Sequence, residues 1–143
     1  MQKKNKIDVE KTTEQIVNWL KSYATNAKVN GFVVGISGGV DSAVTSTLCA
    51  LTGLKVLCVE MPIHQDLKQV SRGKEHIEAL KKRFSNVSNA VVDLTLTFDV
   101  FQNSVPKSDD VAKYNLALAN SRARLRMTTL YYFAGTEGLL VAG

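Results

Sequence analysis

Apolar residues in the first part of the chain change from helical spacing to a short, nearly continuous run. Before the first glycine they recur close to a 3.6-residue period, which predicts an amphipathic helix from about Val9 to Asn26. The segment Phe32-Val33-Val34-Gly35-Ile36 is rich in β-branched and aromatic side chains, as is typical of a buried strand. We therefore expect a helix followed by a strand. The apolar helix positions are Ile16, Val17, Trp19, Leu20 and Tyr23.

The same alternation continues after the glycine pair. Residues Val40 to Leu51 are apolar on nearly every side, which predicts a helix packed on a sheet, and Leu54 to Val59 predicts a second buried strand. Asp66 can cap a third helix, and Ala90 to Leu94 predicts a third strand. The apolar positions expected on one face of the third helix are Leu67, Val70, Ile77, Leu80 and Phe84.

The last third of the chain predicts one more long helix and one more strand. Thr95 to Lys113 contains Pro106 and polar residues and predicts a mobile connection, Tyr114 to Ala134 predicts a helix, and Leu139 to Ala142 a fourth strand. Strands that alternate with helices are typical of a parallel sheet with right-handed crossovers. We expect an α/β fold, namely an open, doubly wound, mostly parallel sheet flanked by helices.

The chain ends directly after the fourth predicted strand. In open α/β sheets, ligands bind outside the carboxyl ends of the strands, so a loop that should contribute to the site would follow Gly143. We therefore expect residues 1–143 to form a single domain that is truncated before its C-terminal part, with an incomplete sheet.

Composition excludes some classes of protein and leaves others open. No apolar run approaches the ~18 residues needed to cross a bilayer, and Met1 to Lys6 lack the apolar stretch of a signal peptide, so we expect a cytoplasmic protein with no membrane contact. Cys49 and Cys58 lie in apolar stretches and are expected in the core rather than as reactive thiols. The net charge of +5 suits a nucleotide, a nucleic acid or solvated lysines equally.

The stretch Gly35-Ile36-Ser37-Gly38-Gly39-Val40-Asp41-Ser42 has the composition of a phosphate-binding loop between a strand and a helix. The glycine pair allows positive φ and close approach of an anion to backbone amides at the positive end of the helix dipole. Asp41 offers a hard oxygen ligand for Mg²⁺. The loop lacks the Lys-Ser/Thr ending of the common P-loop and the three-glycine spacing of the dinucleotide fold. The alternative interpretation is a glycine turn in which Asp41 and Ser42 only cap the helix.

Ser-Gly-Gly-x-Asp-Ser after a first strand resembles the signature of the PP-loop ATP pyrophosphatases, whose domains are of the adenine nucleotide alpha hydrolase type. Those enzymes cleave ATP between the α and β phosphates, adenylate an oxygen, and displace AMP with a nitrogen or sulfur nucleophile. The resemblance implies that Gly35 to Ser42 bind ATP and that Asp41 holds Mg²⁺.

A second run, Asn120-Ser121-Arg122-Ala123-Arg124-Leu125-Arg126-Met127 with Tyr131, resembles the signature of ammonia-dependent NAD synthetases. The resemblance implies that Arg124 contacts deamido-NAD, with Asn120 and Tyr131 near the dinucleotide. It further implies ATP, deamido-NAD and ammonia as substrates, a homodimer, no nucleic acid, and no side-chain nucleophile. The family's Thr after the final Gly, an acidic Mg²⁺ ligand and downstream lysines have no counterpart in this sequence.

The residues by themselves leave alternatives open. Arg122, Arg126 and Thr129 share one helical face, while Arg124 lies toward Asn120, and a charged helix is often only solvated. Other functions to consider are a tRNA-modifying PP-loop enzyme, which the basic pI would suit, and a non-catalytic ATP-binding fragment.

The two histidines give weaker indications. His64 follows the second strand at the expected active edge, where a base could matter near pH 7, although a loop histidine is more often structural. His76 lies on a polar stretch of the third helix and is expected to face solvent.

Overall fold

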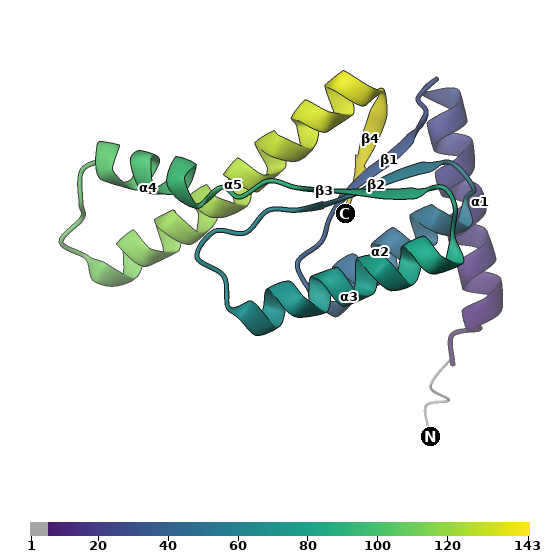
Figure 1. The fold of residues 1–143 in the computed structure, drawn as a ribbon, viewed down its shortest axis with the longest axis horizontal. Helices are drawn as coiled ribbons and strands as arrows, with labels where there is room; N and C mark the ends of the chain where they lie inside the picture. Colours follow the sequence, from purple (N-terminus) through teal and green to yellow (C-terminus); the bar gives the residue numbers. More distant parts are fainter. Residues whose placement is uncertain (1–5) are drawn as a thin grey trace.

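A four-stranded parallel sheet lies at the centre of the structure, with helices on both faces (Figure 1). The structure is a computed structural model that describes residues 6–143, so residues 1–5, in which the sequence analysis finds no signal peptide, lie outside the described part. The elements in chain order are α1 (Val9–Asn26), β1 (Gly31–Gly35), α2 (Val40–Leu51), β2 (Lys55–Glu60), α3 (Leu67–Arg83), β3 (Val87–Val91), α4 (Thr95–Ser104), α5 (Val111–Glu137) and β4 (Leu139–Ala142).

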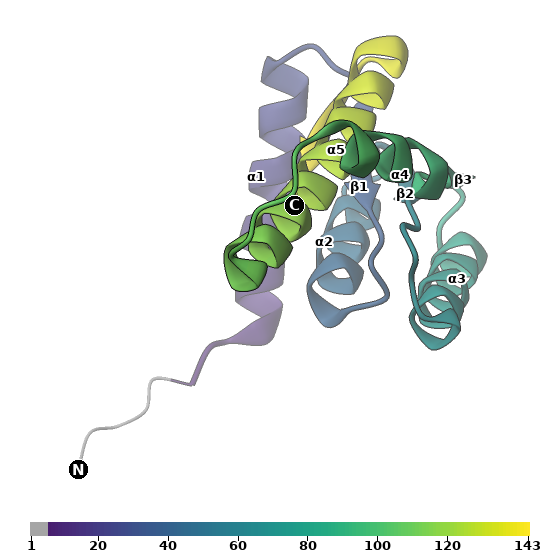
Figure 2. The ribbon, with the colours of Figure 1, turned by 90° about the vertical axis from the view of Figure 1, so that its left-hand side faces the viewer.

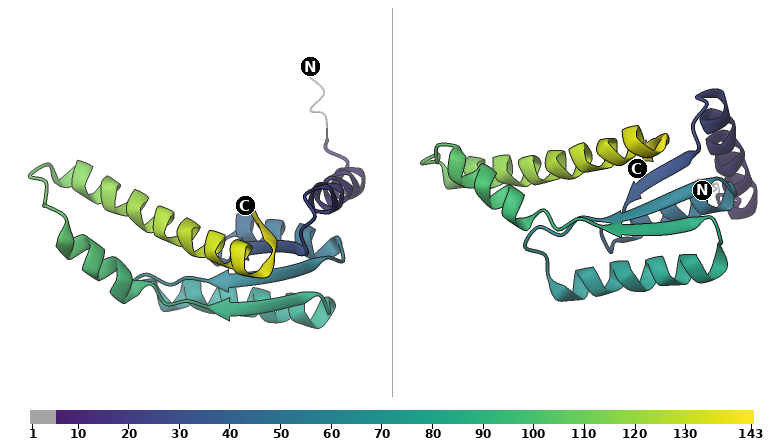
Figure 3. Two further views of the ribbon diagram at one scale, coloured as in Figure 1. Left: turned by 90° about the horizontal axis from the view of Figure 1, so that it is seen from above. Right: turned by 45° about the horizontal axis from the view of Figure 1, so that its top comes forward.

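The sheet separates two apolar cores, as expected of a doubly wound fold. Successive residues of a strand point to opposite faces, so Phe32 and Val34 of β1 pack with α1, α2 and α3, whereas Val33 packs with α4 and α5. Figure 2 shows α4 and α5 on the side of the sheet opposite to α2 and α3, and in Figure 3 α4 and the first half of α5 extend beyond the sheet. The predicted open α/β architecture is confirmed.

The order of the strands is β3-β2-β1-β4. Successive strands are therefore added on one side of β1 as far as β3, and β4 is then added on the other side. Strands β2 and β3 continue on one side of β1, while β4 pairs with its other side from Gly31↔Leu139 onward. Just before these two strands begin, Asn30 donates from Nδ2 to the carbonyl of Glu137 across 3.1 Å. The two residues are 107 positions apart in the sequence. The segment that follows β1 therefore lies at the topological switch point, where open sheets of this type bind ligands.

Most helix boundaries agree with the sequence analysis because local capping determines them. Helices α1 and α2 have the predicted bounds, and the carboxylate of Asp66 accepts a hydrogen bond from the amide of Lys68 at the start of α3. On α3, Ile77 and Leu80 are buried as predicted, but Leu67 is 85% exposed, since it lies on the outer side of the first turn. Helix α5 is longer than predicted at both ends.

Two predictions for the middle of the chain are wrong. The third strand covers Val87–Val91 instead of Ala90 to Leu94, because the chain turns at Asp93, whose carboxylate accepts from the amide of Thr95 across 2.9 Å. The predicted mobile connection contains helix α4, Thr95–Ser104, whose Phe98 is buried at 2% exposure against the second core. Phe98 is the one buried residue of α4, so the apolar residues of this segment do not recur with a clear helical period.

Both cysteines lie in the core on the α2 side of the sheet, as predicted. Burial raises the pKa of Cys49 to about 12 and that of Cys58 to about 11, which keeps both thiols protonated at neutral pH. Within residues 6–143, none of the helices has both the length and the apolar content needed to cross a bilayer.

Candidate functional site

The loop between β1 and α2 is held together by its own serines. The amide of Ser37 donates to Ser42 Oγ across 3.1 Å, and the two hydroxyl oxygens lie 3.2 Å apart. Ser37 Oγ accepts from the amide of Gly39, and Ser42 Oγ donates to the carbonyl of Gly39, each across 3.2 Å. The Ser-Gly-Gly-x-Asp-Ser motif therefore forms a closed turn, which we call the phosphate loop (Ser37 to Ser42).

The two glycines of the phosphate loop have different structural roles. Gly38 has φ +81°, and a Cβ there would lie 2.4 Å from the backbone oxygen of Gln69 on α3, so both its conformation and the close approach of α3 require glycine. Gly39 has φ −94°, which other residues adopt, and an added Cβ would meet only Ser37 Oγ, at 3.3 Å. Gly39 is exposed, so its missing side chain leaves backbone open to a ligand.

The first turn of α2 presents amides that the helix itself cannot satisfy. Its N-cap is Gly39, and no side chain caps the helix, so the interpretation of Asp41 as a mere cap does not hold. Free amides and the helix dipole make such an end favourable for phosphate. The arrangement can bind an anion at the switch point of the sheet.

Asp41 is the carboxylate of the phosphate loop, and it is exposed in the first turn of α2. Within residues 6–143 there is no cluster of three or more His, Cys, Asp or Glu side chains that could hold a metal ion by themselves. Mg²⁺ is commonly held by one or two carboxylates together with phosphate oxygens and water. A single carboxylate beside a phosphate site therefore fits magnesium that arrives with a nucleotide.

A cavity of about 180 Å³ lies between the phosphate loop and α3, and Ser37, Glu60 and Gly73 are among its lining residues. Glu60 ends β2 and is only 7% exposed. Burial raises the pKa of Glu60, and the positive charge of Lys74 opposes that shift in part. This side of the loop thus has a buried carboxyl group that the sequence analysis did not single out.

Helix α5 lies on the other side of the phosphate loop. A cavity of about 340 Å³ is lined by Ser37 and by Arg126, whose Nε donates to the carbonyl of Met61 across 3.0 Å. Burial lowers the pKa of Arg126, and the charge of Arg122 adds to this effect, yet a guanidinium keeps its charge at neutral pH. Sequence reasoning placed Arg126 on a different face of the helix from Arg124 but gave it no role beside the loop.

The residues predicted to bind the dinucleotide lie elsewhere on α5. Arg124 is exposed, and its Nη1 donates to the backbone oxygen of Asn120 across 3.3 Å, as expected for residues four apart. Tyr131 is 63% exposed. None of the three lines the cavities beside Ser37, so the structure does not bring them together with the phosphate loop.

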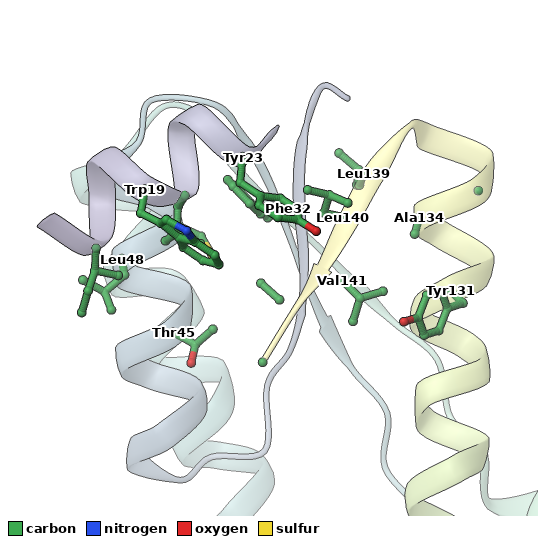
Figure 4. Close-up of a pocket in the computed structure, with 16 residues that line it drawn as sticks. Trp19, Tyr23, Phe32, Thr45, Leu48, Tyr131, Ala134, Leu139, Leu140 and Val141 are labelled. Atoms are coloured by element: carbon green, nitrogen blue, oxygen red, sulfur yellow. The ribbon is translucent and has the colours of Figure 1, made fainter. Parts of the chain in front are cut away.

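Tyr131 instead lines an apolar groove of about 770 Å³ beside β4 (Figure 4). In Figure 4, Trp19 and Tyr23 of α1 face this groove from the side opposite to Tyr131. Within the described residues β4 pairs only with β1, so it forms one edge of the sheet, and its residues line this groove. The sheet is open at this edge.

The two histidines differ from each other in their surroundings. His64 has φ +49° in the loop after β2, and its Nε2 lies 2.7 Å from a carboxylate oxygen of Asp99, which joins this loop to α4. The prediction that His76 faces solvent is wrong, because its Nε2 lies 2.8 Å from Ser46 Oγ on α2. Burial lowers the pKa of His76. The polar sequence around it concealed this contact.

Comparison with known proteins gives one answer for nearly the whole chain. The family described as NAD synthase matches residues 12–143. The NH(3)-dependent NAD(+) synthetase of Carboxydothermus hydrogenoformans is 35% identical over 144 residues, which cover 96% of this chain and 55% of that protein. The enzyme of the same name from Malacoplasma penetrans is 34% identical, with 96% of this chain and 53% of that protein covered.

Solved structures agree with the sequence relatives. An NMN synthetase from Francisella tularensis superposes with a TM-score of 0.82 at 27% identity, over 95% of this chain and 54% of that one. An NH3-dependent NAD synthetase from Campylobacter jejuni, solved with a nitrate ion, superposes with a TM-score of 0.82 at 26% identity. The match covers 95% of this chain and 56% of that one. The chain thus spans about half the length of the relatives it matches.

Proposed function

This chain belongs to the NAD synthase family, and we propose that it supplies the ATP-binding part of a ligase that makes NAD from deamido-NAD, ammonia and ATP. The observation that carries this proposal is the phosphate loop, in which Ser37 and Ser42 close a turn around an exposed Gly39 at the uncapped start of α2. Such a turn suits the polyphosphate of a nucleotide.

The proposed chemistry overcomes the low reactivity of a carboxylate. An oxygen of the nicotinate carboxylate forms a bond to the α-phosphorus of ATP as pyrophosphate leaves. Ammonia nitrogen then attacks the carbonyl carbon of the acyl-adenylate, AMP leaves with the bond's electron pair, and the surplus proton passes to solvent. AMP, pyrophosphate and NAD are the products, and no side-chain nucleophile is required.

The residues of this chain bind and orient the reactants in this scheme. The free amides at the uncapped start of α2 donate toward phosphate oxygens, where negative charge develops as pyrophosphate leaves, while Ser37 and Ser42 hold the loop in shape. Asp41 would hold Mg²⁺, which supplies further neutralisation of that charge when bound. Holding two reactants in line removes a large part of the entropic barrier.

Arg124, with Asn120 and Tyr131, is proposed to contact deamido-NAD, because these residues match the second signature and lie apart from the phosphate loop. A guanidinium can hold a phosphate by two parallel hydrogen bonds. A homodimer and a cytoplasmic location remain predictions of the sequence analysis. The family match favours NAD synthesis over the tRNA-modifying alternative.

Two measurements test the proposal. Isothermal titration with ATP and Mg²⁺ should give a binding signal that adenosine does not reproduce, since the loop is proposed to bind phosphates. Chromatographic detection of NAD, after incubation with deamido-NAD, ATP and ammonium, tests the reaction. Equal binding of adenosine and ATP would contradict the role of the loop. ATP binding without NAD formation would favour the alternative of a non-catalytic ATP-binding protein.

A further inference from the structure

Helix α3 supports the phosphate loop along one of its faces. A Cβ on Gly38 would lie only 2.4 Å from the backbone oxygen of Gln69, and a Cβ on Gly73 would lie 3.8 Å from the amide nitrogen of Gly38. His76 follows on the same face, three residues after Gly73, and reaches Ser46 on α2. The first three turns of α3 thus touch both the loop and the helix that follows it.

Ser46 joins His76 to the start of α2. It is fully buried, and its hydroxyl donates to the backbone oxygen of Ser42 across 2.7 Å and also lies 3.1 Å from that of Ala43. Because the single hydroxyl hydrogen is directed at these carbonyls, Oγ can only accept from His76, whose Nε2–H donates to one of its two lone pairs across 2.8 Å. A buried hydroxyl that loses this donor keeps an unsatisfied lone pair.

This contact lies near the middle of α2, and Ser46 connects it to the first turn of the helix through the carbonyl of Ser42. Among the described residues, one side-chain hydrogen bond connects α2 with α3, and it joins His76 to Ser46. Farther from the loop the two helices are held by apolar packing, with Ile77 and Cys49 in one core. Apolar packing is not directional, whereas a hydrogen bond fixes both distance and orientation.

We propose that His76 is a positioning residue of the ATP site: through Ser46 it fixes the first turn of α2, and with it Ser42 and Ser37, in the arrangement that receives the phosphates. The inference rests on the proposed binding of ATP by this loop. His76 acts from behind the loop and does not touch the nucleotide.

The test compares replacements of His76 that differ in where they place a donor. Gln can place its amide N–H near the position of the imidazole Nε2–H, Asn places it nearer to that of Nδ1, and Leu has no donor. His76→Leu is expected to weaken binding of ATP with Mg²⁺ by about three- to tenfold, the range of one net hydrogen bond. His76→Gln should restore most of the affinity, and His76→Asn should not.

Three further readouts separate positioning from general stability. The KM for ATP should rise in His76→Leu while the KM for deamido-NAD stays unchanged. The loss of ATP affinity in the variant that combines His76→Leu with Ser46→Ala should be smaller than the sum of the two single losses, since both changes break the bond between these residues. Glu78→Gln on the exposed side of α3 is the matched control and should bind ATP like the wild type, with melting curves recorded for all variants.

The outcomes are distinct. If the wild-type protein fails to bind ATP, the proposed function itself is wrong. If the wild type binds ATP and His76→Leu binds it equally well, the positioning role is overturned. A lowered melting temperature with unchanged ATP affinity would overturn it too, as would equal recovery by Gln and Asn. Should His76→Leu fail to fold, the comparison of Gln with Asn still decides.

Discussion

Arg126 donates its Nε hydrogen to the carbonyl of Met61 across 3.0 Å, whereas Arg124, two positions earlier on α5, donates to the carbonyl of Asn120 on its own helix. The first bond fixes α5 against the end of β2, beside the cavity that Ser37 lines. The second leaves the Arg124 side chain on the exposed surface of the helix. Two arginines of one signature therefore have different neighbours, and their replacements should have different effects.

Arg124→Lys keeps the charge but loses the fork that can hold a phosphate by two bonds. We expect the KM for deamido-NAD to rise roughly ten- to hundredfold, corresponding to ~1.5–3 kcal/mol, while the KM for ATP stays near the wild-type value. Initial rates with each substrate varied in turn measure both constants. Arg83→Lys at the exposed end of α3 is the control, and a rise confined to the KM for ATP would contradict the assignment.

Arg126→Lys should mainly lower the stability of the fold. It removes the Nε donor of a half-buried contact and leaves the carbonyl of Met61 without that partner. A loss of about 0.5–1.5 kcal/mol in the free energy of unfolding is expected from denaturant titration. The same loss in Arg124→Lys would show that the two positions do not differ as described.

Gly39→Val tests the exposed backbone of the phosphate loop. Valine is compatible with φ −94° and ψ 169°, and its Cβ would meet only Ser37 Oγ, so we expect the fold to persist. The branched side chain should block the approach of phosphate and weaken ATP binding at least about tenfold in isothermal titration. ATP binding equal to that of the wild type would exclude Gly39 from the site.

Asp41→Asn separates a metal ligand from a helix cap. Since Gly39 is the N-cap and no side chain caps α2, the melting temperature should change little. The magnesium concentration needed for half-maximal activity should rise roughly tenfold, because a neutral amide is a poorer ligand for a hard cation. An unchanged magnesium titration would show that the carboxylate does not bind the ion.

The elements that the sequence predicts well are those whose ends depend on neighbouring residues. Helix α2 follows a glycine pair, and α3 begins where the side chain of Asp66 accepts from a backbone amide. Helix α4 was missed because it is anchored mainly by Phe98, which packs against residues that are distant in the sequence. Tertiary packing of this kind is not visible in local periodicity.

The candidate site shows the same division. The serine turn from Ser37 to Ser42 is local, and its motif alone identified it. The contact of Arg126 with Met61 spans 65 positions, and that of His76 with Ser46 spans 30. Such contacts depend on the distance between two packed elements. The spacing of residues along the chain does not predict that distance. Contact with a buried partner therefore leaves His76 half-buried, where the polar sequence suggested an exposed residue.

The pairing of β4 with β1 has a consequence for the order of folding. Asn30 and Glu137 meet across 107 positions, whereas β1, β2 and β3 pair between consecutive strands. Closing the longer loop costs more conformational entropy, so the three consecutive strands should pair first. Pulsed hydrogen exchange during refolding should protect the amide of Val56 before that of Val141, and simultaneous protection would contradict this order. The loop from Ser37 to Ser42 lies wholly within the early segment, so the proposed nucleotide site is expected to take shape while the last strand is still unfolded.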